Sequence, residues 1–214
     1  MESSVFSRKP TDQDVEGMLE TLVLAFANDP VWGGWAFPDR NQAIQQRRAI
    51  FGLWLRSALR YPAVRVTQAC EAVALWYPPW GSENTEEDER QLISTARSLL
   101  GSHADVFLKG CDLIEASHPQ EKPHYYLSLL GTHDNHRGKG LGMTLLQETL
   151  ALIDAAAMPA YLESTNPSNN HRYERVGFKR IGAYSLPADG PQVDMMWRDP
   201  IGSKRQAPAV SQRS

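Results

Sequence analysis

Residues 125–142 read YYLSLLGTHDNHRGKGLG, and this stretch decides the fold. Its first part, 125–132, is an apolar run of the kind that forms a buried strand. A glycine-rich turn follows, after which apolar residues recur at helical spacing over 141–157. A further short strand is predicted at 161–164. Because two strands joined by a crossover helix pair in parallel, the sequence predicts a layered α/β or α+β fold.

The rest of the chain adds helices and strands on both sides of this unit. Thr11 and Asp14 are a candidate capping pair for a helix that ends near Pro30. Further helices are predicted at 41–60, at 86–116 with a break at Gly101-Ser102, and at 169–176. Further strands are predicted at 5–8, 64–68, 72–77, 178–186 and 193–197. In the helix 41–60, the inward-facing residues are expected to be Ile44, Phe51, Leu55 and Leu59.

Composition excludes several classes of protein. The chain has 214 residues, 42% of them hydrophobic and 22% charged, with a formal net charge of −3. These values predict one domain over 1–200 and a disordered tail at 201–214. The sequence has no bilayer-length apolar run and no signal-peptide pattern, so we expect a cytoplasmic protein without a membrane partner. The slightly acidic balance argues against nucleic acid. Cys70 and Cys111 are expected to be reduced thiols.

The turn Arg137–Gly142 carries the chemistry. Its three glycines allow close backbone approach to a ligand, and the N–H groups of the following helix start attract an anion such as a pyrophosphate. The register excludes two nucleotide motifs. A phosphate-binding P-loop would need glycine at His133, and a dinucleotide fingerprint would need glycine at Met143. A glycine turn that binds no ligand remains the alternative.

Arg137, Gly140 and Gly142 form the pattern R-x-x-G-x-G, which resembles the acetyl-coenzyme A motif Q/R-x-x-G-x-G/A of the GCN5-related N-acetyltransferases (GNAT). A second segment follows in the order that the family shows: Asn166 stands seven residues before Tyr173, which opens Y-E-R-V-G-F. The segments AFANDP, FPDR, AVALWYPP and YLEST resemble the puromycin N-acetyltransferase branch. That enzyme has a tyrosine where Asp29 stands here, so puromycin itself is in doubt as the substrate.

The resemblance implies a GNAT-type fold, with a mixed, mostly antiparallel sheet and one parallel strand pair around the cofactor loop. It also implies acetyl-coenzyme A as cosubstrate, without a metal. The strand backbone would pair with the pantetheine arm, the turn would bind the pyrophosphate, and Asn166 would contact the arm. The cofactor-binding residues so implied are Leu129, Leu130, Gly131, Thr132, Arg137, Gly138, Lys139, Gly140, Leu141, Gly142 and Asn166.

Other residues are candidates for the chemical step. By the resemblance, Tyr173 is the general acid that protonates the leaving thiolate. Glu163 is the candidate base. The alternative is that it is a buried carboxylate that orients a tyrosine or loop amides. The main-chain N–H of Leu130 is the candidate to polarise the thioester carbonyl. His133 and His136 have no third convergent ligand, so no metal site is predicted. The expected substrate pocket consists of Asp29, Trp32, Trp35 and Tyr126.

The predicted function is acetyl-coenzyme A-dependent N-acetylation of a primary amine on a small molecule, by direct transfer in a ternary complex. The protein is expected to be a monomer or a homodimer. Two alternatives remain open: a non-catalytic acyl-coenzyme A sensor, and an acetyltransferase that acts on a protein amine.

Overall fold

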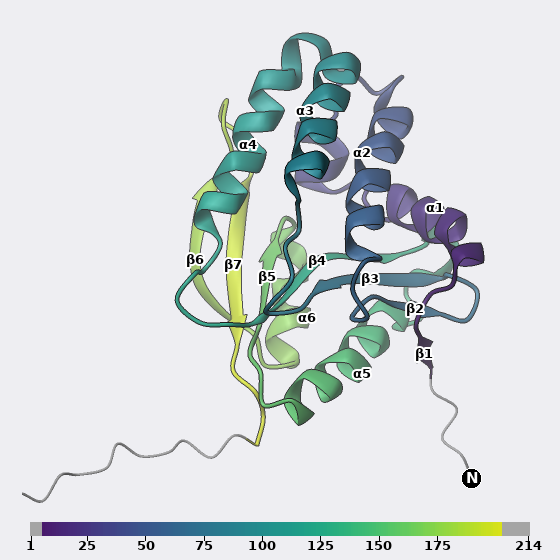
Figure 1. Cartoon of the computed structure of the whole chain (residues 1–214), viewed down its shortest axis with the longest axis vertical. Coiled ribbons are helices and arrows are strands. Elements are labelled where there is room, and N and C mark those ends of the chain that lie inside the picture. The colour runs from purple at the N-terminus through teal and green to yellow at the C-terminus, as the bar shows by residue number, and fades with distance from the viewer. Residues whose placement is uncertain (1–5, 203–214) are drawn as a thin grey trace, which may run out of the picture.

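The computed structural model describes residues 6–202, and one seven-stranded sheet runs through it (Figure 1). The strand order is β1-β2-β3-β4-β5-β7-β6. Neighbours are antiparallel, except that β4 and β5 are parallel, which confirms the predicted mixed sheet. The strands are β1 (Ser7–Arg8), β2 (Arg65–Thr67), β3 (Ala72–Tyr77), β4 (Tyr125–Thr132), β5 (Ala160–Ser164), β6 (Lys179–Ser185) and β7 (Gln192–Arg198).

Helices cover both faces of the sheet. In Figure 1, α1 to α4 lie on one side and α5 and α6 on the other. The helices are α1 (Val15–Ala25), α2 (Ala43–Ala58), α3 (Glu86–Leu100), α4 (Ala104–Ser117), α5 (Leu141–Ala155) and α6 (Asn170–Arg175). The predicted break between α3 and α4 is confirmed at Gly101, whose φ of +52° suits glycine. The N–H of Thr11 donates to the carboxylate of Asp14 at 2.7 Å, as the capping pattern predicts.

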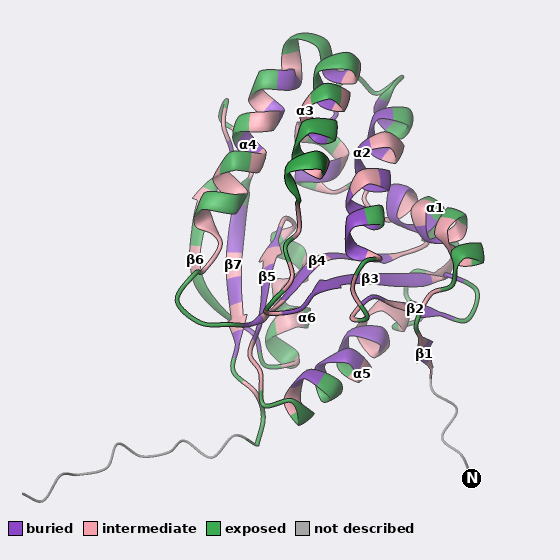
Figure 2. Cartoon of the chain, in the orientation of Figure 1, coloured by how far each residue is buried: buried purple, intermediate pink, exposed green. Residues whose placement is uncertain are grey.

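Two hydrophobic cores result, one on each face of the sheet. Figure 2 shows the central strand β3 buried between the helical layers, whereas β6 at the edge of the sheet is largely exposed. Phe51 and Leu55 of α2 are buried as predicted, but the prediction for Ile44 is wrong, because its side chain is 63% exposed. The buried face of α2 runs instead through Ala43 and Arg47, which leaves Ile44 on its flank at the first turn. Hydrophobic spacing alone does not reveal that an arginine takes an inward position.

The central strands diverge where β4 passes Leu127. β4 pairs with β5 only through Tyr125–Leu127 and Ala160–Leu162. On its other edge, β4 carries a bulge at Ser128, since Leu75 pairs with Leu129 but Trp76 pairs with Leu127. Beyond this point the β5 side of β4 has no strand partner, so its backbone is open to another group.

Two predictions fall partly outside the described residues. The predicted tail at 201–214 lies outside them from residue 203 onward, as does Val5 of the predicted first strand. Across 6–202, none of the helices combines the length and apolar character that crossing a membrane requires.

Candidate active site

A cleft of about 680 Å³ opens where β4 and β5 diverge, between the start of α5 and α6. The glycine turn forms one wall. Gly138 and Gly140 have φ values of +78° and +77°, which side chains rarely adopt. At Gly142 a Cβ would lie 2.6 Å from Thr132 Oγ1, so the close packing of α5 on β4 also favours glycine. The turn therefore favours glycine at 138 and 140 because of the positive φ, and at 142 because α5 packs closely on β4.

The cleft is suited to an anion. His136, Arg137, Arg172 and Arg175 line it, and Asp29 is the carboxylate in its wall. Arg137 pairs with Asp134 at 2.7 Å and donates to the carbonyl of Ala25 at 2.6 Å. Together with the N-terminal N–H groups of α5, these side chains could hold an anionic group such as a pyrophosphate.

The structure separates the predicted cofactor residues into two groups. Those that line the cleft are Leu130, Thr132, Arg137, Gly138, Gly140, Leu141, Gly142 and Asn166. The other three lie elsewhere. Leu129 is in the core, and Gly131 packs against α1, where a Cβ would lie 3.0 Å from Ala25 Cβ. Lys139 points its amine toward His136 Nδ1 at 3.4 Å.

Tyr173 stands in the wall of the cleft on α6. Burial, with Asp29 nearby, raises the pKa of its phenol to about 12, while Arg172 opposes the shift. The hydroxyl therefore stays protonated at neutral pH and can donate. Asn166 precedes α6 in the cleft wall, where its side-chain Oδ1 accepts a hydrogen bond from the N–H of Ser168 at 3.1 Å.

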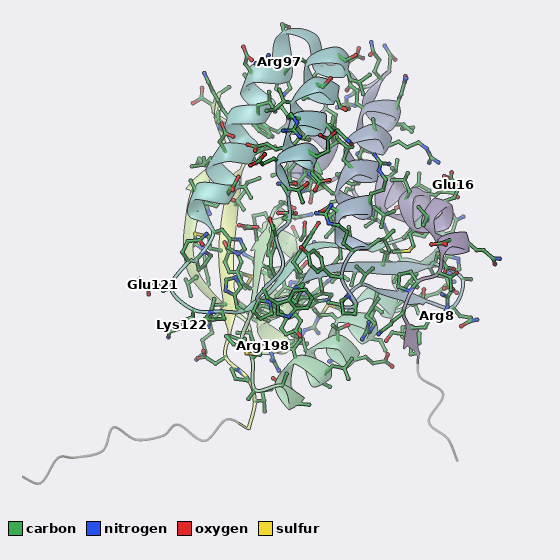
Figure 3. All side chains as sticks on the ribbon, in the orientation of Figure 1. Arg8, Glu16, Arg97, Glu121, Lys122 and Arg198 are labelled. Carbon is green, nitrogen blue, oxygen red and sulfur yellow. The ribbon has the colours of Figure 1, made fainter. Side chains whose placement is uncertain are left out.

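A second cavity, of about 770 Å³, lies between the α3–α4 pair and the sheet. It reaches from Arg97 on α3 to Lys122 before β4, residues that Figure 3 shows at opposite ends of this region. Trp32 and Tyr126, two predicted pocket residues, line it. Trp35 does not line this cavity, because its indole N–H donates to the carbonyl of Pro187 at 3.0 Å and its ring packs near Gly190.

The π-helical turn η2 (Pro30–Trp35) positions Trp32 and Trp35. Asp29 begins it, since its Oδ1 accepts from the N–H groups of Val31 and Trp32 at 2.9 Å. Its Oδ2 accepts from Thr165 at 2.8 Å. Asp29 thus joins the turn to the end of β5 and lines the cofactor cleft rather than the larger cavity.

Glu163 projects from β5 into the larger cavity. Its carboxylate accepts from two phenols, Tyr126 at 2.7 Å and Tyr161 at 2.9 Å. Burial raises the pKa of Glu163 to about 7, although the two phenol hydrogen bonds oppose the shift. A carboxyl group that titrates near neutrality can accept a proton under physiological conditions.

Glu83 is a functional candidate that the sequence analysis missed. It lies between β3 and α3, lines the same cavity, and accepts from the Ser128 hydroxyl at 2.6 Å. Burial raises its pKa to about 7, and the nearby Glu115 adds to the shift. Only the Pro-rich loop after β3 could have hinted at this placement, because no motif marks Glu83.

A small cavity of about 50 Å³ shares wall residues with both larger ones. Its wall contains Glu163, which also lines the larger cavity, and Tyr173 and Leu130, which also line the cleft. It lies where β4 and β5 diverge. A group that can accept a proton (Glu163), a group that can donate one (Tyr173) and the open edge of β4 therefore line the same small cavity.

Two further features bear on the chemistry. Within the described part of the chain, no three side chains of His, Cys, Asp or Glu gather closely enough to hold a metal ion. Both cysteines are free thiols, and Cys111 lines the larger cavity. Burial raises the pKa of Cys111 well above its ordinary range, so this thiol stays protonated and is a poor nucleophile.

Comparisons with known proteins agree with this geometry. Residues 70–178 match the model of the acetyltransferase (GNAT) family. A structure from Corynebacterium glutamicum, described as a histone acetyltransferase HPA2 and related acetyltransferase, is 28% identical to this chain. The match covers 91% of this chain and 95% of that one, with a TM-score of 0.66.

Two more distant matches show the shared fold. A polyamine N-acetyltransferase from Drosophila melanogaster is 14% identical, with 90% and 98% of the two chains covered and a TM-score of 0.59. The arylalkylamine N-acetyltransferase 2 from Aedes aegypti is 12% identical, with 90% and 97% covered and a TM-score of 0.59. The narrower resemblance to the puromycin N-acetyltransferase branch stays a prediction.

Proposed function

This chain belongs to the acetyltransferase (GNAT) family, and on that premise we propose that it moves an acetyl group from acetyl-coenzyme A to a primary amine of a small molecule. One observation carries the proposal: the small cavity lined by both Glu163 and Tyr173 shares wall residues with the cationic cleft and with the larger cavity. A cosubstrate in the cleft and an amine in the larger cavity would meet at this junction.

The cleft supports acetyl-coenzyme A as the donor. Its cationic wall and the N–H groups at the start of α5 would hold the pyrophosphate, which supplies binding energy away from the reacting atoms. The open edge of β4 past Leu127 would pair with the pantetheine arm as an added strand does. The N–H of Leu130 is then the donor placed to polarise the thioester carbonyl.

The side chains at the junction support direct transfer. Glu163 takes a proton from the incoming amine, whose nitrogen then attacks the thioester carbon. Tyr173 gives its phenolic proton to the departing sulfur. A cysteine intermediate is not needed, and the raised pKa of Cys111 argues against one.

The larger cavity supports a small amine as acceptor. Aromatic side chains and carboxylates share its walls, among them Trp54, Tyr77, Glu83 and Glu115. Its position beneath α3 and α4 encloses the acceptor, which suits a small molecule better than a protein surface. The fold likeness to polyamine and arylalkylamine N-acetyltransferases agrees with this class, although neither match identifies the amine.

A turnover panel tests the proposal. The purified chain is mixed with acetyl-coenzyme A and, in turn, aminonucleosides, aminoglycosides, polyamines, amino acids and a lysine-containing peptide. Release of free coenzyme A thiol is followed, and the acetylated product is identified by mass spectrometry. We expect turnover with at least one small amine. Turnover with the peptide alone would reassign the acceptor, and coenzyme A binding without any turnover would favour a sensor.

A further inference from the structure

Glu83 and Glu163 are brought together by the register of the two central strands. Leu127 pairs with Leu162, so Ser128 and Glu163 occupy the next positions on β4 and β5. Ser128 holds Glu83 by a hydrogen bond of 2.6 Å, and Tyr126 holds Glu163 by one of 2.7 Å. Both carboxyls line the same cavity, Glu163 from β5 and Glu83 from the loop between β3 and α3.

The backbone of Glu83 is also anchored, since the Ser57 hydroxyl of α2 donates to its carbonyl. Within residues 6–202, neither Glu83 nor Glu163 takes part in a salt bridge. Other titratable or charged side chains line the same cavity: Tyr77, Glu89, Arg97, Asp105, Lys109, Cys111, Asp112, Glu115, His118, Lys122, His124, Tyr126 and Tyr184. The side chains that act directly on the Glu83 carboxyl are Ser128 and Glu115. Those that act directly on the Glu163 carboxyl are Tyr126, Tyr161 and Glu83.

An unsatisfied hydroxyl lies in the same cavity. The Tyr184 oxygen is buried and has no hydrogen-bond partner among the described residues, and Tyr184 lines the cavity together with Glu83 and Glu163. A buried hydroxyl without a partner is costly unless a bound molecule satisfies it. This observation indicates a polar ligand beside the two carboxyls.

Electrostatics supports treating the two groups as a pair. Burial raises both pKa values to about 7, and the neighbouring Glu83 raises that of Glu163 further. Two buried carboxylates that interact lose their protons in steps that belong to the pair rather than to either residue.

We propose that Glu83 and Glu163 act as one unit, which shares a single proton in the free protein and captures the acceptor as an ammonium ion. This inference rests on the proposed function. Binding of the ammonium releases the shared proton to solvent. One N–H proton of the ammonium then passes to the pair and restores its starting state.

The remaining step balances atoms and charge. The neutral amine forms the new C–N bond, and the C–S bond of the thioester breaks. Tyr173 gives its proton to sulfur, and the second proton lost by nitrogen replaces it through solvent. Per turnover, one ammonium ion and one thioester yield one amide, one thiol and one proton in solution.

The proposal names a substrate class. An aliphatic amine has a pKa near that of lysine, about 10.4, so it arrives charged and benefits from two carboxyls. An aromatic amine is neutral at the same pH and gains little from a second carboxyl. The pair therefore selects aliphatic primary amines over aromatic ones.

The first test measures the coupling without any substrate. Glutamate carboxyl carbons are labelled, and their titration is followed by NMR in the native chain and in Glu83→Gln and Glu163→Gln. We expect each substitution to lower the titration midpoint of the remaining carboxyl, because a neighbouring negative charge is lost. Unchanged midpoints in folded variants would overturn the proposal.

The second test measures specificity. With an aliphatic amine accepted by the native protein, Glu83→Gln should lower kcat/KM about 10- to 100-fold, which is the effect of losing a charged hydrogen bond. With an aromatic amine of similar size, the loss should be at most a few-fold. Glu86→Gln is the matched control, since Glu86 is 94% exposed outside the cavity, and it should change neither value.

The proposed function and the carboxyl pair can be rejected separately. If no amine is acetylated by the native protein, the proposed function fails, whereas the NMR titration still decides whether the carboxyls interact. If the native protein acetylates amines but Glu83→Gln retains the native kcat/KM for both amine types, the proposed function stands and the pair is rejected.

Discussion

Burial raises the pKa of both Tyr173 and Glu163, yet it prepares them for opposite tasks. The phenol moves to about 12, so it remains a proton donor at any physiological pH. The carboxyl moves to about 7, where it exchanges protons readily. One physical cause therefore suits Tyr173 to the proposed role of acid and Glu163 to the proposed role of base, because the two groups start from different ordinary pKa values.

Tyr173→Phe separates a catalytic role from a packing role. The substitution keeps the ring, which packs at 6.2 Å between ring centres with Phe178, so stability should change little. If the hydroxyl protonates the leaving sulfur, the single-turnover rate should fall about 10²- to 10⁴-fold. Acetyl-coenzyme A affinity, measured by calorimetry, should stay near native. A native single-turnover rate would remove Tyr173 from the mechanism.

The raised pKa of Glu163 also has a consequence for stability. In the folded chain this group keeps its proton up to about pH 7, whereas its ordinary pKa is 4.5. Between these values the folded state binds more protons than the unfolded state, so the free energy of unfolding falls as the pH rises. Relative to native, Glu163→Gln should therefore gain stability as the pH rises through this window.

Urea denaturation of native and Glu163→Gln protein at several pH values measures the difference between their unfolding free energies. The contributions of titratable groups that both proteins share cancel in this difference. A difference that stays constant from about pH 4.5 to about pH 7 would contradict the raised pKa.

At the scale of elements, the turn before α5 combines a left-handed backbone conformation with a place in the wall of the cleft. Gly140 begins α5 in a left-handed conformation with φ +77° and ψ 1°, and it lines the cleft. Its conformation directs the first N–H groups of the helix toward the cleft. Gly101, between α3 and α4, also has positive φ, but it lies outside the cleft.

Because Gly140 lines the cleft and Gly101 does not, substitutions at these two glycines form a matched pair. Gly140→Ala and Gly101→Ala should each cost about 1–2 kcal/mol of unfolding free energy, since alanine disfavours positive φ and a Cβ would meet no atom within 4 Å at either site. Only Gly140→Ala should also weaken coenzyme A binding, by about 10-fold, because it disturbs donors to an anion. Equal coenzyme A affinity in both variants would reject the turn as the anion site.

The bulge at Ser128 shows how one residue sets the geometry of the site. Without it, β4 would continue its regular pairing with β3, and the Ser128 hydroxyl would lose its position toward Glu83. The same position marks the end of pairing between β4 and β5. Strand register and carboxyl placement are thus linked at one point.

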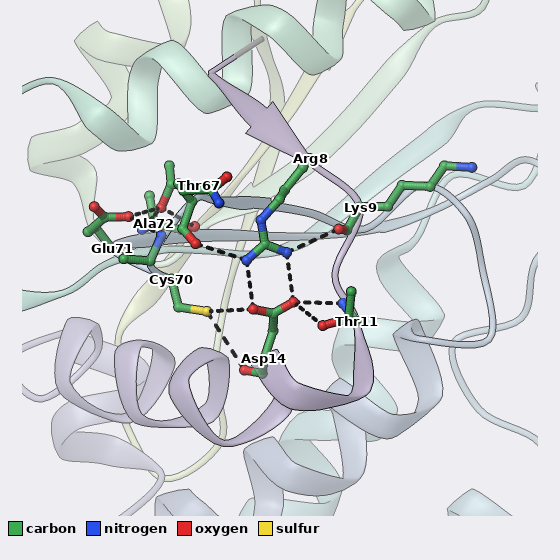
Figure 4. A network of polar contacts seen from close by, with 10 residues as sticks. Arg8, Lys9, Thr11, Asp14, Thr67, Cys70, Glu71 and Ala72 are labelled. Atoms are coloured by element: carbon green, nitrogen blue, oxygen red, sulfur yellow. Dashed lines mark hydrogen bonds and ion pairs between the residues drawn. The ribbon is translucent and has the colours of Figure 1, made fainter. Parts of the chain in front are cut away.

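At the scale of the whole molecule, a polar network ties the N-terminal segment to the β2–β3 hairpin (Figure 4). Arg8 donates to both oxygens of Asp14 at 2.7 Å and to the carbonyl of Gln68 at 2.9 Å. Cys70 Sγ lies 3.6 Å from the same carboxylate. The pair with Arg8 lowers the pKa of Asp14 below its ordinary value of 3.8.

Asp14→Asn tests whether this network stabilises the fold. Because the pKa is lowered, the contribution is present above about pH 4 and is lost as the pH falls below that value. At neutral pH we expect a loss of about 1–2 kcal/mol in unfolding free energy by urea denaturation. At acid pH the difference from native should shrink.

Glu16→Gln is the control for this prediction. Glu16 pairs with Arg48 on the surface, and its side chain is 75% exposed (Figure 3). Exposed pairs contribute little, so this variant should lie within about 0.5 kcal/mol of native at every pH. Equal losses in the two variants would show that the partly buried network adds nothing to an ordinary surface pair.

Local sequence patterns were sufficient to predict many of the element bounds in this protein. The bounds of β3 and β4 agree with the prediction, as do the start of α5 and the break at Gly101, because alternation, helical spacing and glycine signals act over a few residues. The glycine turn at 137–142 is predictable for the same reason, since the positive φ of Gly138 and Gly140 depends on backbone freedom that the sequence displays directly.

Only the tertiary structure decided what surrounds the reacting groups. Glu83 reaches the site through a hydrogen bond to Ser128, 45 positions along the chain, and Tyr126 and Glu163 are 37 positions apart. Trp35 leaves the expected pocket because Pro187 accepts its indole N–H. A pKa near neutrality depends on burial and on neighbours brought together by folding, and these long-range contacts have no counterpart in the spacing of residues along the chain.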